Sequence, residues 1–374
     1  MMPIVVDCGA NTCKVGFVNE DQPCAIFEPF VSQAKPRREL LNSSNACYVG
    51  NQLSRRRDVF PLASSPIQNG IIQDWHAMEE IFKYIFFDEL DVDPLHQTVI
   101  LSEPSLNPLK QRERMVEMLF EVFHIPALYI ASQSMLALYS SGKTTGIVVD
   151  SGDSMTSVVP IYEGYTVQNG IQQQDISGKH LEQYLARQKL LWKKGYRFGL
   201  HHRENDIIRT MKENSCYIAL DYQKEMEHFK QGKLKGKCFQ LPDDSQITLD
   251  IECFQCPEML FHPQLVGIQS YGLIDMVCKC IQEIPYNIRK DLWNNIVLSG
   301  GSMMITGIQD RLKKDLKNNI PSTAAFHIFR LPDARLSTWL GGSILGNLPS
   351  FEKICMTLEE YHELGAAMIH ERCF

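Results

Sequence analysis

The same short pattern occurs twice along the chain. Residues 4–9 read IVVDCG, and residues 147–152 read IVVDSG. Each copy is a β-branched run that enters an Asp-x-Gly turn and continues into a second apolar run, at residues 13–18 and 157–162. This pattern is typical of a β-hairpin, and its repetition predicts a duplicated fold with two related halves. A ligand site is then expected between the halves, where binding clefts commonly lie.

Helical patterns separate these strands. A helix is expected to begin at Asn107–Pro108, because proline suits a first helical turn. Its predicted apolar face comprises Met115, Met118, Leu119 and Val122. A second helix is expected at residues 132–139, and a buried strand, a glycine turn and a helix follow one another over residues 295–316. This alternation favours α/β lobes with central sheets.

Composition narrows the class of protein. The chain of 374 residues is long enough for more than one core, and its net charge of −7 argues against a dedicated nucleic-acid binder. We expect no membrane insertion, because no apolar stretch approaches the roughly 20 residues that cross a bilayer. No secretory signal is visible, so the twelve cysteines are expected to be thiols inside the cell.

Two closely spaced cysteine pairs are candidate metal ligands. Cys253-x-x-Cys256 has zinc-like spacing, but Cys278-x-Cys280 does not. Because closed zinc sites need four ligands at suitable spacing, these residues are expected to be small half-buried hydrophobes.

The two hairpins are well suited to a polyphosphate. Tight turns direct backbone N–H groups at phosphate oxygens without adding charge, and Gly9 and Gly152 are expected to let the two turns bend. Lys14 follows closely enough to reach the β- and γ-phosphates. The glycine pair Gly300–Gly301 precedes a helix and is expected to hold the adenosine and the α-phosphate.

Asp7 and Asp150 end their strands at matching positions. Two carboxylates beside a triphosphate require a hard cation, which predicts Mg²⁺ or Ca²⁺ held partly through water. Capping of the turns is the alternative for either Asp taken alone.

Longer motifs resemble those of actin and the actin-related proteins over the whole chain. They are EPSLNP at residues 103–108, SGKTTGIVVDSGD at 141–153, VPIYEGY at 159–165, LSGG at 298–301 and WLGGSIL at 339–345. The resemblance implies the duplicated α/β ATPase fold that actin shares with chaperone-type ATPases and sugar kinases, with two lobes around a nucleotide cleft. The EPSLNP wording and the ending at residues 372–374 resemble testis-type actin-related proteins.

Each lobe is expected to contain two subdomains. The first would comprise residues 1–28, 67–133 and 335–374, and the second residues 29–66. The third would comprise residues 134–178 and 270–334, and the fourth residues 179–269.

The resemblance assigns further roles. Arg209, Lys212 and Glu213 match residues that hold adenine and ribose, although alone they read as an ordinary charged helix face. Asp153 matches a contact to the ribose and phosphates, and Arg335 occupies the position of an adenine-side lysine. The remaining matches are Ser302 and Met304 in the nucleotide pocket, and Gln133, which would position the attacking water.

Four positions around the expected phosphates depart from the family. Ala10 replaces a serine that faces the γ-phosphate, and Ser157 replaces a histidine that organises the lytic water. Asn11 and Ser154 replace glycines of the two phosphate loops. A lost proton-handling group costs about 10²–10⁴-fold in rate, whereas a lost neutral hydrogen bond costs about 1 kcal/mol. ATP or ADP binding is therefore expected to persist, with hydrolysis slow or absent.

Some of the family's assembly surfaces keep their apolar character in this sequence, and others do not. The residues that resemble the family's apolar partner cleft are Tyr139, Tyr165, Ile344, Leu345 and Leu348, with plain core as the alternative for each. Residues 265–268 keep the apolar character of an inter-strand plug. The polar residues 35–47 replace an apolar loop tip, and residues 230–237 form a basic stretch. Both stretches are expected to be surface loops, with docking of an acidic partner as the alternative.

The expected function is that of a nucleotide-binding scaffolding component of a cytoskeletal assembly in the cytoplasm. Its partners would be cytoskeletal or actin-binding proteins, in a hetero-assembly rather than a long homofilament. Two alternatives stay open: a slow filament-forming ATPase like conventional actin, and an actin-like subunit of a nuclear remodelling complex. A small-molecule kinase would need a catalytic carboxylate for which no motif is present, and a chaperone-type ATPase would need a peptide-binding domain.

Overall fold

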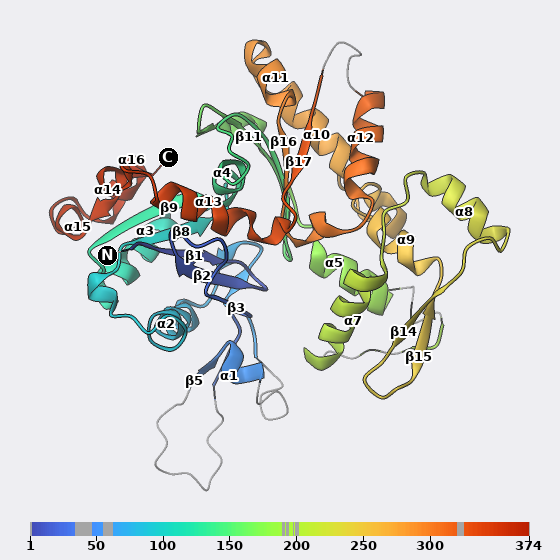
Figure 1. Cartoon of the computed structure of the whole chain (residues 1–374), viewed down its shortest axis with the longest axis horizontal. Coiled ribbons are helices and arrows are strands. Elements are labelled where there is room, and N and C mark those ends of the chain that lie inside the picture. Colours follow the sequence, from blue (N-terminus) through green and yellow to red (C-terminus); the bar gives the residue numbers. More distant parts are fainter. Residues whose placement is uncertain are drawn as a thin grey trace, which may run out of the picture. The chain divides into compact units, whose positions relative to one another are not determined.

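The structure, a computed structural model, describes residues 2–33, 47–54, 63–188, 191, 194–196, 198, 202–319 and 325–373. Two compact units make up the chain (Figure 1). The first unit comprises Met1–Val148, Ile161–Thr166 and Leu331–Phe374, and the second comprises Val149–Pro160 and Val167–Arg330.

The first unit is built on one six-stranded sheet with the strand order β18-β9-β8-β1-β2-β3. Its strands are β1 (Ile4–Cys8), β2 (Cys13–Phe17), β3 (Ala25–Phe27), β8 (Val99–Glu103), β9 (Ala127–Ser132) and β18 (Met356–Thr357). Strands β1, β8 and β9 are parallel, and β2 returns antiparallel to β1. All residues of β1 and β8 are buried, as expected for central strands that are covered on both faces.

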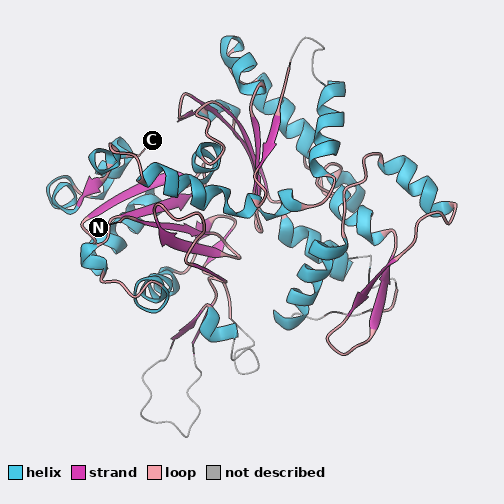
Figure 2. Ribbon diagram, viewed as in Figure 1, coloured by secondary structure: helices cyan, strands magenta, loops and turns pink. Residues whose placement is uncertain are grey.

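The first unit also contains helices (Figure 2). They are α1 (Asn51–Ser54), α2 (Trp75–Lys83), α3 (Leu109–Glu117), α4 (Gln133–Tyr139), α13 (Ser337–Gly346), α14 (Phe351–Ile354), α15 (Leu358–Leu364) and α16 (Ile369–Arg372). Helix α13 packs against α4 and against β1. Trp339 of α13 is fully buried and donates a hydrogen bond to the backbone oxygen of Val5 at 3.3 Å. The α13–α4 packing depends on Gly341, because a Cβ there would lie 1.8 Å from the backbone oxygen of Leu136.

A second sheet has the order β12-β11-β10-β16-β17, with β13 also paired to β11. Its strands are β10 (Gly146–Ser151), β11 (Thr156–Tyr162), β12 (Tyr165–Thr166), β13 (Gln172–Gln174), β16 (Ile296–Ser299) and β17 (Ile328–Arg330). The order β17-β16-β10-β11-β12 corresponds strand for strand to β9-β8-β1-β2-β3 of the first sheet. The predicted duplication is thereby confirmed.

The remaining helices belong to the second unit. They are α5 (Gly178–Gln183), α7 (His202–Ser215), α8 (Tyr222–Lys230), α9 (Glu252–Glu258), α10 (Leu273–Gln282), α11 (Tyr286–Trp293) and α12 (Ile308–Asn319). Within the described residues, three two-stranded sheets are also present, namely β4 (Val31–Gln33) with β5 (Cys47–Val49), β6 (Ile67–Gln68) with β7 (Ile71–Ile72), and β14 (Lys237–Gln240) with β15 (Gln246–Leu249).

The structure differs in part from the helix and loop boundaries that the sequence predicts. The helix expected at Asn107–Pro108 begins at Leu109, with Pro108 at its N-cap in an extended conformation. Its expected face is buried except at Val122, which is 46% exposed and lies in the π-helical turn that follows α3. The basic stretch at residues 230–237 does connect α8 to β14, as expected. The expected loop at residues 35–47 lies outside the described residues except for Cys47.

Among the helices that the structure describes, none is long and apolar enough to span a membrane. The division into four subdomains stays a prediction.

The close packing of α13 on α4 generates a test. We expect Gly341→Ala to lower the free energy of unfolding by about 3 kcal/mol, since the added methyl would meet rigid backbone. Denaturant unfolding of the purified protein measures the change. Gly152→Ala is the matched control, because the nearest atom to its added Cβ lies 4.0 Å away, and we expect a change within about 0.5 kcal/mol. Equal midpoints for the two variants would contradict this account of the packing.

Candidate nucleotide-binding site

The two hairpins close with the same backbone geometry. Gly9 N donates to Thr12 O at 3.0 Å in the first, and Gly152 N donates to Met155 O at 3.1 Å in the second. Each bond leaves a two-residue turn, Ala10–Asn11 and Asp153–Ser154, whose residues are only half buried. The repeated sequence pattern therefore folds into a repeated turn, with one copy in each unit.

The glycines of these turns act differently from the expectation. Neither Gly9 nor Gly152 has a positive φ, so neither is needed to bend its turn. Asn11 and Ser154 also lie outside the left-handed region, so neither residue strains the backbone of its turn. What Gly152 provides is space, because a Cβ there would meet no atom closer than 4.0 Å.

A charged cluster lies at the end of the first hairpin's incoming strand. Asp7 and Lys14 are opposite each other in the β1–β2 register, and Lys14 Nζ lies 2.9 Å from Asp7 Oδ2. Both residues are buried, with exposures of 4% and 8%. The ammonium group that was expected to reach toward phosphates is thus held by the carboxylate of Asp7.

Neighbouring parallel strands complete this cluster. Ser102 of β8 donates to Asp7 Oδ1 at 2.6 Å, and Gln133 Nε2 lies 3.5 Å from both Asp7 Oδ1 and Ser102 Oγ. Gln133 is the first residue of α4, directly after β9. Asp7, Ser102 and Gln133 therefore gather at the carboxyl ends of adjacent parallel strands, where ligand sites of such sheets are built.

In the second unit the glycine turn packs onto the second hairpin. Gly300 has φ +90°, and a Cβ there would lie 2.4 Å from Ser151 O and 2.9 Å from Asp150 Oδ1. Ser302 donates from its hydroxyl to Gly152 O at 3.2 Å. The structure thus brings together Asp150, Gly152, Gly300 and Ser302, as the sequence led us to expect. Gly301 and Met304 bound the 3₁₀ turn that contains Ser302.

A second charged cluster follows this hairpin. Glu182 of α5 lies 2.8 Å from Lys212 Nζ and 3.6 Å from Arg209 Nε of α7. Burial raises the pKa of the Asp153 carboxyl, and the charge of Glu182 raises that pKa further, while Arg209 and Lys212 lower it. Asp153, Arg209 and Lys212 therefore share one electrostatic environment. Glu213 of the same helix is instead exposed.

Two partners in these clusters were missed from the sequence. Ser102 is separated from Asp7 by 95 positions, and Glu182 is separated from Lys212 by 30. No spacing rule links positions so far apart, because only the folded sheet and the helix packing bring them together.

Arg335 belongs to the first unit and is already paired. Its guanidinium lies 2.7 Å from Asp333 Oδ2, and this hydrogen-bonded partner lowers the pKa of the Asp333 carboxyl. Ser157 of β11 is buried, with 7% exposure. Among the described residues, no group of three or more His, Cys, Asp or Glu side chains is arranged to hold a metal ion directly.

The residues expected to line a partner cleft differ in exposure. Tyr165, Ile344 and Leu348 are exposed, at 61%, 47% and 48%, and Tyr139 is half buried. Leu345 is only 5% exposed, so it is a core residue of α13 and does not line a surface. We refer to Tyr139, Tyr165, Ile344 and Leu348, which the resemblance assigns to the partner cleft and which all belong to the first unit, as the apolar patch.

These features define a duplicated, actin-like ATPase fold with related turns in its two units. Comparison with known protein families matches the actin family over residues 1–374. The chain belongs to the actin family, and is thereby a cytoskeletal, actin-like protein.

The buried pair at the first hairpin generates a test. We expect Lys14→Met to lower the free energy of unfolding by about 3–5 kcal/mol, because it leaves the buried Asp7 carboxylate without its partner. The double variant Asp7→Asn with Lys14→Met should regain most of this loss, because the neutral amide can still accept from Ser102. Urea unfolding without nucleotide measures the free energy of unfolding of the wild type, the two single variants and the double variant. Strictly additive losses would show that the two groups are not coupled.

Proposed function

We propose that this protein is a nucleotide-binding scaffolding component of a cytoskeletal assembly, with weak or absent ATP hydrolysis. The observation that carries the proposal is the pair of matched turns, one in each unit, which keep half-exposed backbone and open space at Gly152. Backbone N–H groups of such turns suit phosphate oxygens, and a glycine leaves room for close approach.

The ligand would be ATP or ADP with Mg²⁺ or Ca²⁺. In the first unit Gly9, Asn11, Lys14 and Arg335 would contact the nucleotide. In the second unit the contacts would come from Asp150, Gly152, Asp153, Ser154, Arg209, Lys212, Glu213, Gly300, Gly301, Ser302 and Met304.

The cation would neutralise phosphate charge, and Asp7 and Asp150 would hold it through water. Asp7 fits an indirect role, because its carboxylate already accepts from Lys14 and Ser102. Bound phosphate would then compete with Asp7 for the Lys14 ammonium.

Weak hydrolysis follows from the side chains at two positions. Ala10 has no hydroxyl to offer a phosphate, and Ser157 has no ring to relay a proton. Gln133 would be the one residue that orients water, held near Asp7 and Ser102. A lone glutamine supports only slow turnover in unassisted GTPases.

Within the family we further propose a testis-type actin-related protein of the cytoplasmic cytoskeleton. This assignment is supported by the EPSLNP wording at residues 103–108 and by the RCF ending.

Nucleotide binding is tested by thermal unfolding. We expect Mg-ATP to raise the melting temperature by several degrees, since a ligand at 1,000 times its Kd stabilises a fold by about 4 kcal/mol. Gly152→Ala should melt like the wild type without nucleotide but show a smaller rise, because its methyl would occupy the space assigned to phosphate. A wild type that melts at the same temperature with and without Mg-ATP would remove the basis of the proposal.

Hydrolysis is tested by single-turnover release of phosphate from bound ATP. We expect the double variant Ala10→Ser with Ser157→His to accelerate release by about 10²-fold, because it supplies a hydroxyl and a proton-handling group. Ala10→Ser alone is the control and should change the rate much less. A wild type that already hydrolyses ATP as fast as conventional actin would show that these departures carry no cost.

The proposed assembly uses the apolar patch. Exposed aromatic and aliphatic side chains on one unit suit an apolar helix of a cytoskeletal or actin-binding protein. A head-to-tail filament would need a second, complementary surface on every subunit. The polar residues 35–47, with Lys35, Arg37 and Arg38, are a poor candidate for that surface.

Sedimentation in Mg-ATP and physiological salt tests this arrangement. We expect the protein to stay in the supernatant, and to bind an actin-binding protein that carries an amphipathic helix. Ile344→Asp should weaken that binding at least about tenfold, because a charge enters the apolar contact. Tyr286→Asp, at an 86% exposed position outside the patch, should not. Abundant filaments with an actin-like repeat would instead favour the slow filament-forming ATPase.

A further inference from the structure

Two cysteines face each other across the first hairpin. In the β1–β2 register Cys8 is the partner of Cys13, next to the pair Asp7–Lys14. Because Gly9 N donates to Thr12 O, the neighbouring pair Cys8–Cys13 falls at a non-hydrogen-bonded position of the ladder. Directly opposite residues project to the same face of a sheet, so the two thiols lie on the face opposite the Asp7–Lys14 ion pair.

This position suits a covalent link. Cα atoms of a non-hydrogen-bonded pair are about 4.5 Å apart, which falls within the range of about 4.4–6.8 Å seen for disulfides. Both cysteines are free thiols in the structure. A bond between them therefore needs rotation of the side chains and only a small twist of the hairpin stem.

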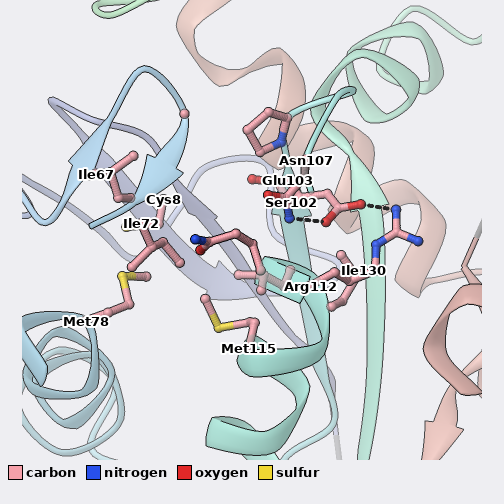
Figure 3. Close-up of a pocket in the computed structure, with 14 residues that line it drawn as sticks. Cys8, Ile67, Ile72, Met78, Ser102, Glu103, Asn107, Arg112, Met115 and Ile130 are labelled. Atoms are coloured by element: carbon pink, nitrogen blue, oxygen red, sulfur yellow. Dashed lines mark hydrogen bonds and ion pairs between the residues drawn. The ribbon is translucent and has the colours of Figure 1, made fainter. Parts of the chain in front are cut away.

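One of the two cysteines borders a small cavity. Cys8 lines a cavity of about 40 Å³ in the first unit, together with Met78, Met115 and Arg112 (Figure 3). This volume exceeds the roughly 10–15 Å³ that one water needs. Two atoms of its wall residues, Gln111 Oε1 and Arg112 Nε, lack a hydrogen-bond partner among the described residues. The cavity therefore suits water and molecules of similar size and polarity.

The two thiols differ in access. Cys8 is 8% exposed, whereas Cys13 is fully buried. Burial, together with the adjacent Cys8 thiol, raises the pKa of Cys13 well above its usual range. Cys8 is thus the sulfur that meets an oxidant first, and Cys13 is placed to react with the product.

We propose that Cys8 and Cys13 form a peroxide-oxidisable dithiol, a modification site at the base of the first phosphate-facing turn. The Cys8 thiolate attacks one oxygen of hydrogen peroxide, the O–O bond breaks, and Cys8 becomes a sulfenic acid while hydroxide leaves with the electron pair. The Cys13 sulfur then attacks the Cys8 sulfur and expels hydroxide, which takes the thiol proton to form water. Overall, two thiols and one peroxide give one disulfide and two waters.

Differential alkylation tests the proposal. Reduced native protein is exposed to hydrogen peroxide, denatured in iodoacetamide and digested with trypsin. Both cysteines fall in the peptide that ends at Lys14, because no lysine or arginine precedes it. We expect this peptide to carry neither alkyl group and to weigh two hydrogens less than the unlabelled dithiol, and to take up both labels when it is alkylated after reduction with dithiothreitol. In Cys13→Val the Cys8 sulfenic acid should persist long enough to react with dimedone.

Other residues provide internal controls. Cys216 and Cys256 are also buried neighbours but do not line this cavity, and they should stay alkylatable. Met78 and Met115 report entry of peroxide, because each becomes a sulfoxide without a partner. Sulfoxide at these methionines with both Cys8 and Cys13 still alkylated would overturn the proposal. So would a sulfinic acid at Cys8 of the wild type in place of the disulfide.

A second measurement tests whether the Cys8–Cys13 disulfide weakens ATP binding. This step rests on the proposed nucleotide binding. A disulfide requires a dihedral near 90° at the sulfurs, which twists the hairpin stem and displaces the turn. We expect oxidised protein to lose at least half of the ATP-dependent rise in melting temperature, reversibly, with no such loss in Cys13→Val. If protein that carries the disulfide shows the same ATP-dependent rise in melting temperature as reduced protein, the disulfide does not affect ATP binding. Absence of any rise in reduced protein would refute nucleotide binding and leave the disulfide result standing.

Discussion

The pairing of β1 with β2 is the constraint on which the rest of the candidate site depends. One register places Asp7 opposite Lys14 on one face and Cys8 opposite Cys13 on the other. A slip by one residue would move Lys14 away from Asp7 and leave the buried carboxylate without its partner. Because an unpaired buried charge costs several kcal/mol, the ion pair itself enforces the register. The position of the turn, and so of its backbone donors, follows from it.

The pairing of adjacent strands also determines which residues meet at the carboxyl ends of the strands. Asp7, Ser102 and Gln133 come from three consecutive positions across the first sheet, β1, β8 and the start of α4 after β9. In the second unit Asp150 is the next-to-last residue of β10 and Gly300 follows β16, at the corresponding places of the duplicated order. Duplication thus supplies each unit with a turn and with a carboxylate close to it. The duplicated order of the two sheets thus agrees with the assignment to the actin family.

How much could be predicted depended on how local the signal was. The hairpins, the duplication and the glycine turn were predictable, because strand periodicity and Asp-x-Gly turns are encoded within a few residues. The roles of Ser102 and Glu182 were not, since their partners lie far away in the chain. Conformation at single residues also escaped prediction. Gly152 was expected to bend its turn, yet it provides space, and Leu345 was expected at a surface, yet it is buried.

These distinctions explain why binding and catalysis can separate in such a fold. Contacts through backbone N–H groups depend on the turn's geometry, and that geometry is the same at Gly9 and Gly152 although the residues around them differ. Catalysis would depend instead on particular side chains, and under the proposed function Ala10 and Ser157 alter those while the backbone of the turns keeps its geometry. Under the proposed function, side-chain changes such as those at Ala10 and Ser157 would slow the reaction more than they weaken binding. Backbone contacts from the two turns would then help to keep the nucleotide as a structural element after its hydrolysis is lost.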